Sequence, residues 1–148
     1  MALYGGSIYE TNDALDNKPC VDFLSGPTTG SSLLEMAITL ASYTNIAAGG
    51  VFGLARASSV VQLSPTYLIP YEIGDLVSTS ALAQAWSTAP AIPTIFLRRT
   101  TPAGATQGVG VIWSFPRGLR ILQGNSMAVY TIGGGPMYSY TISVEVDE

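Results

Sequence analysis

The chain has 148 residues and a formal net charge of −4, a length that fits one compact domain. Charged residues supply only 11% of the sequence and apolar residues 47%, so a free monomer would have too few charges to cover its surface. With no histidine, and with Cys20 as its only cysteine, the chain cannot form a Ser-His-Asp triad, a His-containing zinc site or an internal disulfide.

Residues 1–30 differ from the rest of the chain, because they are polar and are broken by Pro19 and Pro27. This pattern predicts an extended N-terminal arm ahead of a single β-sandwich domain at 31–148. We expect part of the arm to bind a neighbouring subunit; the alternative is that it adds an edge strand to its own sheet. Its expected anchors are Tyr4, Ile8, Tyr9, Val21, Phe23 and Leu24.

Short strands separated by Gly and Pro turns are predicted from residue 33 onward. Residues 34–41 alternate with a period of two, and residues 51–60 are expected to return as the second arm of a hairpin across Gly49–Gly50. The run from Tyr67 to Ile73 contains Pro70, which favours an edge strand or a loop. The apolar face of the first strand is expected to hold Leu34, Met36, Ile38 and Leu40.

Residues 80–86 are rich in Ala and contain Leu82, which predicts one short helix. The last strand is the clearest, because apolar and polar residues alternate from Tyr138 to Asp147. The pattern as a whole predicts an all-β fold, an antiparallel β-sandwich of jelly-roll type with an extended N-terminal arm and at most one short helix. Further strands are expected at 94–100, 109–115, 119–122 and 127–132.

The charges are segregated along the sequence. Residues 1–75 are strongly acidic, whereas residues 76–144 contain no acid and four arginines: Arg98, Arg99, Arg117 and Arg120. Two interpretations stay open: head-to-tail contact between copies, or neutralisation between neighbouring strands of one subunit. Pairing of these arginines with carboxylates of another subunit is favoured over nucleic acid binding, because the pI is about 4.6 and the chain has a single lysine.

No motif for catalysis or cofactor binding is present. Glu72 and Asp75 are the best carboxylate pair and are interpreted as an acidic turn. The uncharged stretch from 77 to 97 contains Pro90 and Pro93 and is not a credible membrane helix, and residues 1–6 show no secretory signal. We therefore expect no enzymatic activity, no metal, no cofactor, no membrane partner and assembly in the cytoplasm.

The segment GLRILQGNSMAVYTI at 118–132 is followed by a Gly-rich turn and by an alternating strand that ends in acids. This arrangement resembles the closing strands of small jelly-roll proteins of tailed-phage virions, the capsid decoration or cement proteins. The resemblance implies a non-enzymatic virion component, often a homotrimer, that binds the major capsid protein and is assembled in the host cytoplasm. It carries over no catalytic residues.

The sequence pattern is also compatible with two other functions. The chain could be another virion component, such as a tail or adaptor subunit. It could also be a carbohydrate-binding sandwich, which would need an exposed row of aromatic side chains. In each virion interpretation we expect a homo-oligomer or burial against a larger lattice, and we expect Cys20 to be a structurally passive thiol.

Overall fold

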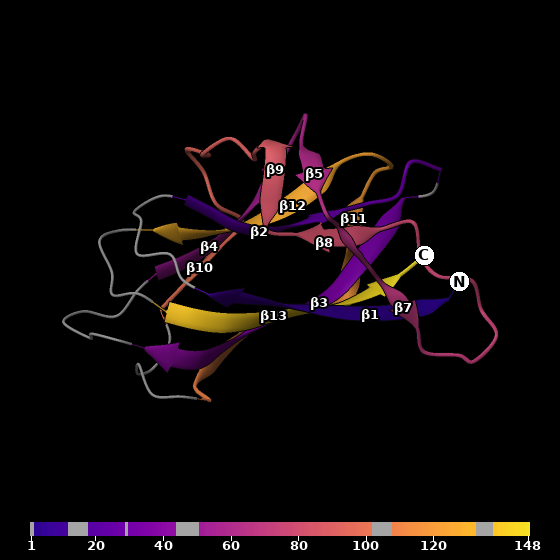
Figure 1. The fold of residues 1–148 in the computed structure, drawn as a ribbon, viewed down its shortest axis with the longest axis horizontal. Coiled ribbons are helices and arrows are strands. Elements are labelled where there is room, and N and C mark those ends of the chain that lie inside the picture. The colour runs from indigo at the N-terminus through magenta and orange to yellow at the C-terminus, as the bar shows by residue number, and fades with distance from the viewer. Residues whose placement is uncertain (1, 12–17, 29, 44–50, 102–107, 133–137) are drawn as a thin grey trace.

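The structure is a computed structural model that describes residues 2–11, 18–28, 30–43, 51–101, 108–132 and 138–148. Within these ranges the chain is all-β, with two antiparallel sheets packed face to face and no helix (Figure 1). The predicted antiparallel β-sandwich is therefore confirmed.

Two sheets, A and B, contain most of the strands. Sheet A has the order β11 (Gly110–Ile121), β3 (Ser31–Tyr43), β13 (Tyr138–Asp147), β1 (Leu3–Thr11) and β7 (Ile69–Pro70). Sheet B has the order β10 (Arg98–Thr100), β4 (Val51–Ala57), β12 (Ser126–Ile132), β2 (Lys18–Leu24), β8 (Ala81–Ala83) and β6 (Thr66–Tyr67). The strands β5 (Val61–Leu63) and β9 (Ala85–Thr88) pair separately.

The strand order is that of a jelly roll. The set β1-β13-β3-β11 in sheet A faces the set β2-β12-β4-β10 in sheet B, which is the arrangement made by two Greek keys. Residues 58–97 are an insertion between β4 and β10, and they supply β5 to β9. Strand β7 pairs with β1 at Tyr4 and Gly5, and β8 pairs with residues 22–24 of β2, so the insertion covers part of one edge of each sheet.

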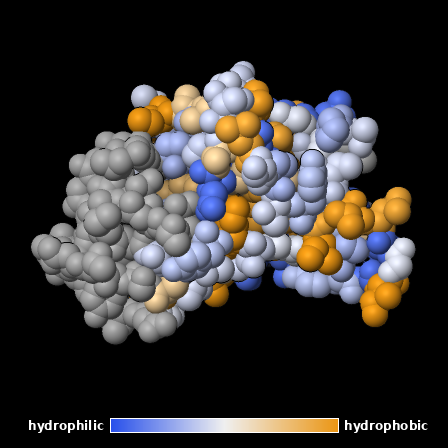
Figure 2. All heavy atoms as spheres, in the orientation of Figure 1, coloured by the Kyte–Doolittle hydropathy of each residue, from blue (hydrophilic) through white to orange (hydrophobic). Residues whose placement is uncertain are grey.

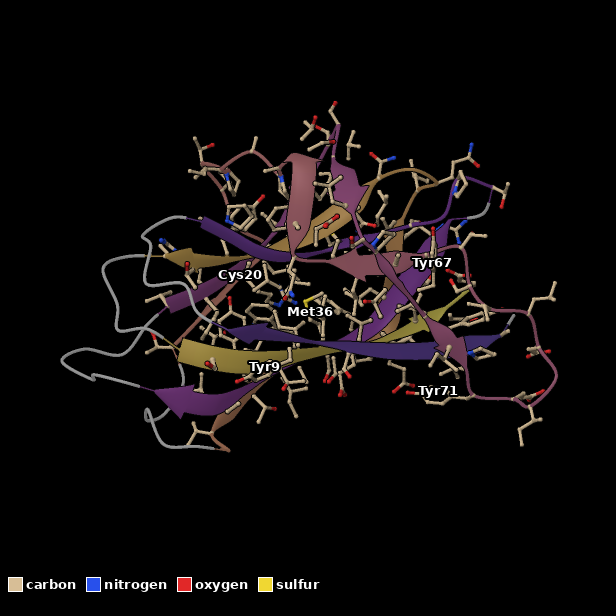
Figure 3. The ribbon with its side chains drawn as sticks, in the orientation of Figure 1. Tyr9, Cys20, Met36, Tyr67 and Tyr71 are labelled. Carbon is tan, nitrogen blue, oxygen red and sulfur yellow. The ribbon has the colours of Figure 1, made fainter. Side chains whose placement is uncertain are left out.

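The core lies between the sheets. Strand β13 buries Tyr140, Ile142, Val144 and Val146, as its alternation predicts, and sheet B supplies the opposing side chains. Phe52 of β4 meets Tyr140 edge-on, with ring centroids 5.5 Å apart. Figure 3 shows Met36 pointing between the sheets and Tyr9 pointing away from them. The sheet B residues in this core include Val21, Phe23, Leu54, Leu82, Met127 and Val129.

The N-terminal strands differ from the expected division into an arm at 1–30 and a domain at 31–148. Strand β1 lies between β13 and β7, and β2 lies between β12 and β8. The alternation of β1 is hidden in the sequence by two glycines. A Cβ at Gly5 would lie 2.6 Å from Oη of Tyr71, and one at Gly6 would lie 2.6 Å from Cδ2 of Leu68. The glycines thus make room for the inserted segment, which packs on both sides of β1.

Three local expectations are wrong. The strands at 34–41 and 51–60 do not form a hairpin, because β3 and β4 belong to different sheets; their expected turn at Gly49–Gly50 lies outside the described residues. Leu33, rather than Leu34, is buried with Met36, because the register of β13 against β3 shifts there. The expected helix at 80–86 is replaced by β8 and β9, since pairing with β2 overrides a weak helical preference.

The remaining strands lie close to the expected positions. The expected strand at 94–100 shortens to β10, and those at 109–115 and 119–122 merge into β11, which has a register shift between Ser114 and Leu119. Pro70 sits in β7 at the edge of sheet A, as its position in the sequence predicts.

Candidate interaction surfaces

The outer face of sheet B is covered by the insertion. Tyr130 and Ala128 of β12 and Ala55 of β4 are fully buried there although they face away from the main core. Phe96 meets Tyr130 edge-on at 5.7 Å, and the Tyr130 hydroxyl donates a 2.8 Å hydrogen bond to the carbonyl of Ala91. The chain itself therefore completes this face.

A buried carboxylate fixes β5 and β9 to sheet B. Nε1 of Trp86 donates to Oδ1 of Asp22 at 2.6 Å, and Nε2 of Gln62 lies 3.1 Å from each oxygen of the same carboxylate. Burial raises the pKa of Asp22 to about 6, and the hydrogen bonds from Trp86 and Gln62 partly offset this effect. Burial, with the nearby Asp22 and Cys20, raises the pKa of Tyr130 to about 12.

The Asp22 cluster is structural rather than catalytic in its geometry. The side chain of Asp22 has no exposed surface, and both of its oxygens accept hydrogen bonds from the protein. A general acid needs access to a substrate, which this closed arrangement does not give. Sequence reasoning missed the cluster because Asp22, Gln62 and Trp86 come from distant parts of the chain.

A second polar cluster holds Glu148 in place. The hydroxyls of Ser31, Ser78 and Ser80 donate to its Oε1 atom, those of Ser31 and Ser78 at 3.3 Å and 2.7 Å. Ser80 also accepts a hydrogen bond from the backbone N–H of Gly26 at 2.9 Å. The cluster joins the start of β3 to the insertion and to Glu148. Its hydroxyl groups find their hydrogen-bond partners within the chain.

The outer face of sheet A is open. Its cross-strand rows follow from the register: Arg120, Ser32, Asp147 and Leu3 form one row, and Ser114, Glu35, Glu145 and Gly5 form the next. Ile112 and Tyr9 lie farther along this face and are 64% and 49% exposed. The face thus presents small polar residues together with three partly exposed carboxylates, those of Glu35, Glu145 and Asp147.

The four arginines singled out in the sequence lie on β10 and β11, the edge strands of the two sheets, and all are exposed. We call this the arginine edge. The guanidinium of Arg98 lies over the ring of Phe115 at 5.5 Å, and that of Arg99 over Phe96 at 5.2 Å. Among the residues that the structure describes, no ion pair joins an arginine to a carboxylate. Neutralisation within one subunit is therefore not seen in the described part of the chain.

An apolar loop at residues 69–77 projects from the end of the sandwich where both chain termini lie (Figure 1). Figure 2 shows hydrophobic side chains gathered at this end. Ile73 is fully exposed and Leu76 is 86% exposed. Glu72 and Asp75 form the expected acidic turn, with the N–H of Asp75 3.4 Å from the carbonyl of Glu72. The loop's other exposed apolar side chains are Ile69, Tyr71 and Val77.

A groove of about 430 Å³ adjoins this loop. Gly5, Gly6 and Ser7 of β1 and Ser143 of β13 line it, and the insertion contributes two exposed tyrosines, Tyr67 and Tyr71 (Figure 3). The groove joins the apolar loop to the open face of sheet A.

The expected arm anchors are divided between the core and the surface. Tyr4 and Phe23 are buried in the chain's own core, and Ile8 packs against it. They are therefore not available to a neighbouring subunit in this conformation. Tyr9 remains at the surface of sheet A.

The exposed pair Ile73 and Leu76 was not expected from the sequence. The signal that could have found it is two large apolar residues on either side of the turn residues Gly74 and Asp75.

In the described ranges no group of three or more Cys, Asp or Glu side chains is placed to hold a metal ion, and no helix could cross a membrane. Comparison with known proteins finds no protein-family model that matches the chain and no curated protein that is significantly similar to it.

Proposed function

We propose that this chain is a non-enzymatic structural protein of a phage virion, a cement or decoration protein that binds and stabilises the lattice of the major capsid protein. The observation that carries the proposal is the apolar loop, which exposes Ile73 and Leu76 at one end of an otherwise well-packed sandwich. A contiguous exposed apolar patch marks a site of protein contact. Jelly rolls also recur among viral capsid domains, which supports the choice of partner.

The loop suits a contact that is repeated over a lattice. Burying each large apolar side chain contributes about 1.5–3 kcal/mol before the cost of ordering is subtracted. Strand β7 anchors one end of the loop by pairing with β1, and Ser78 anchors the other end through its 2.7 Å hydrogen bond to Glu148. A loop held at both ends loses less entropy on binding than a free tail.

The test uses particles of the virus that encodes the chain, purified from a strain that lacks this gene. Recombinant chain is mixed with the particles, and bound copies are counted after sedimentation. We expect Ile73→Ser combined with Leu76→Ser to weaken binding at least tenfold, because about 1.4 kcal/mol corresponds to a factor of ten. Ile95→Ser is the matched control, since Ile95 is 83% exposed but lies outside the loop.

Two results would overturn the proposal: a folded wild-type chain that does not bind the particles, or loop variants that bind as tightly as Ile95→Ser. Circular dichroism on each variant separates loss of binding from loss of fold.

The groove favours a second candidate, a carbohydrate-binding module. Tyr67 and Tyr71 present exposed rings beside the hydroxyls of Ser7 and Ser143, a combination that suits sugar stacking and hydrogen bonding. A glycan array separates the candidates. Glycan binding that is lost in Tyr67→Ala and kept in Ile73→Ser would support the module, and no binding would reject it.

A further inference from the structure

We propose that the outer face of sheet A binds the arginine edge of a second copy of this chain, in a head-to-tail contact. This inference goes beyond the proposed function, because it concerns contact between copies and needs no capsid protein.

The acidic side of the contact is the open sheet face. Glu35 on β3 and Glu145 on β13 are directly opposite each other in the register, and Asp147 lies in the adjacent row. Like charges that face each other across strands are destabilising. In the described residues no cation of the same chain pairs with any of the three carboxylates. Cations from outside the chain would relieve the repulsion.

The basic side of the contact is already ordered. The stacking of Arg98 on Phe115 and of Arg99 on Phe96 restricts these side chains while leaving them exposed. Arg117 and Arg120 extend the same edge along β11. Arginine is favoured over lysine at interfaces because its planar guanidinium can pair with a carboxylate through two hydrogen bonds.

The distance between the acidic residues and the arginines within one chain favours a second copy as the partner. Strand β3 separates β13 from β11, so Glu145 lies two strands, about 10 Å, from β11. Arg120 lies on the same face as Asp147, but Ser32 stands between them, and the other three arginines lie outside this row. Pro116 and the register shift in β11 also discourage direct pairing between two β11 edges, which leaves the side chains to make the contact. Because the two surfaces differ, the contact is heterologous and closes a ring when its rotation allows.

Charge reversal tests the proposal by sedimentation velocity on the full chain. The face variant carries Glu35→Arg and Glu145→Arg, and the edge variant carries Arg99→Glu and Arg117→Glu, because Arg120 lies in the same outer-face row as Asp147. We expect the wild type to self-associate at micromolar concentration, and each variant alone to associate at least tenfold more weakly. Combining all four changes in one chain should restore association, because the acidic and basic surfaces are then exchanged. A mixture of the two variants should associate again with the variants alternating, because the basic face of one pairs with the acidic edge of the other and the acidic face of the second pairs with the basic edge of the first.

Arg56→Glu is the control, because Arg56 is an exposed arginine on β4, outside both surfaces. It should associate like the wild type, and raising the salt from about 0.05 M to about 0.5 M should weaken association of both. A monomeric wild type, association that survives both charge reversals, or a combined variant that stays monomeric would each overturn the proposal. Binding to particles is measured separately, so a failure here leaves the test of the apolar loop intact.

Discussion

The two outer faces of the sandwich differ in how they are completed. Sheet B is covered by the chain's own insertion, and it buries Tyr130 and even the carboxylate of Asp22 beneath that cover. Sheet A is covered by the insertion only near β1, where Tyr71 lies against Gly5, and it presents Glu35, Glu145 and Tyr9. The same jelly-roll frame thus has one outer face that the chain covers itself and one outer face that the chain leaves mostly open. The low charge content of the sequence is consistent with this division, because an uncovered face of small polar residues is suited to burial by a partner.

The largest expected effect compares one tyrosine from each face. Tyr130→Ala opens a cavity beneath the insertion and should lower the free energy of unfolding by about 3–5 kcal/mol, the range for large aromatic truncations. Tyr9→Ala, on the open face, should change it by less than about 1 kcal/mol. Urea denaturation measures both. Equal losses at the two positions would show that the faces are not energetically distinct.

The covered face of sheet B should also make the free energy of unfolding depend on pH, through the buried carboxyl of Asp22. The pKa of Asp22 is raised from 3.8 to about 6 in the folded chain, so the folded state binds more protons than the unfolded state between these values. The contribution of Asp22 to stability is therefore full below about pH 4 and falls as the pH rises to about 6. The difference corresponds to about 3 kcal/mol at 1.36 kcal/mol per pKa unit.

Asp22→Asn isolates this contribution. The unfolding free energy of the variant relative to the wild type should rise by about 2.4 kcal/mol between pH 4 and pH 7, most of the full difference. The amide's own hydrogen bonding shifts both values equally and does not affect this trend. A difference that is constant with pH would mean that the folded state does not raise the pKa of Asp22.

A smaller loss of stability is expected on substitution of Trp86, whose indole N–H joins the insertion to Asp22 of sheet B. Trp86→Phe removes the N–H that donates to Asp22 at 2.6 Å and should cost about 1–3 kcal/mol. It should also raise the pKa of Asp22 further, because that hydrogen bond lowers it. Carboxyl chemical shifts followed through a pH titration measure the change. An unchanged pKa would show that Trp86 does not contact the carboxylate in solution.

The smallest effect is expected at Cys20. Cys20→Ser places a hydroxyl in a core position that is 6% exposed and should cost about 1 kcal/mol, with no loss of self-association. Denaturation and sedimentation check the two parts. Loss of association would show that this buried thiol has a role that its position does not suggest.

The sequence predicts the fold where local patterns are strong. The alternation in β13 places Ile142, Val144 and Val146 in the core correctly. It fails where long-range contacts decide the structure. Gly5 and Gly6 hide the alternation of β1 because the packing of Tyr71 and Leu68, distant in sequence, requires them.

The surfaces were predictable to different degrees. The arginine edge could be proposed from the sequence because Arg98 and Arg99 are adjacent and no acid lies nearby in the chain. The Asp22 cluster could not, because Gln62 and Trp86 meet the carboxylate only after the insertion folds onto sheet B. A pattern read along the chain gives no information about such a contact.

Amide hydrogen exchange of the chain, free and bound to purified particles, tests most directly whether the covered outer face of sheet B and the open outer face of sheet A differ in binding. We predict that binding slows exchange in the apolar loop at 69–77 and in the edge strand β11, and leaves β5 and β9 unchanged, because the chain already covers sheet B. Slower exchange confined to β5 and β9, with the loop and β11 unaffected, would contradict the account.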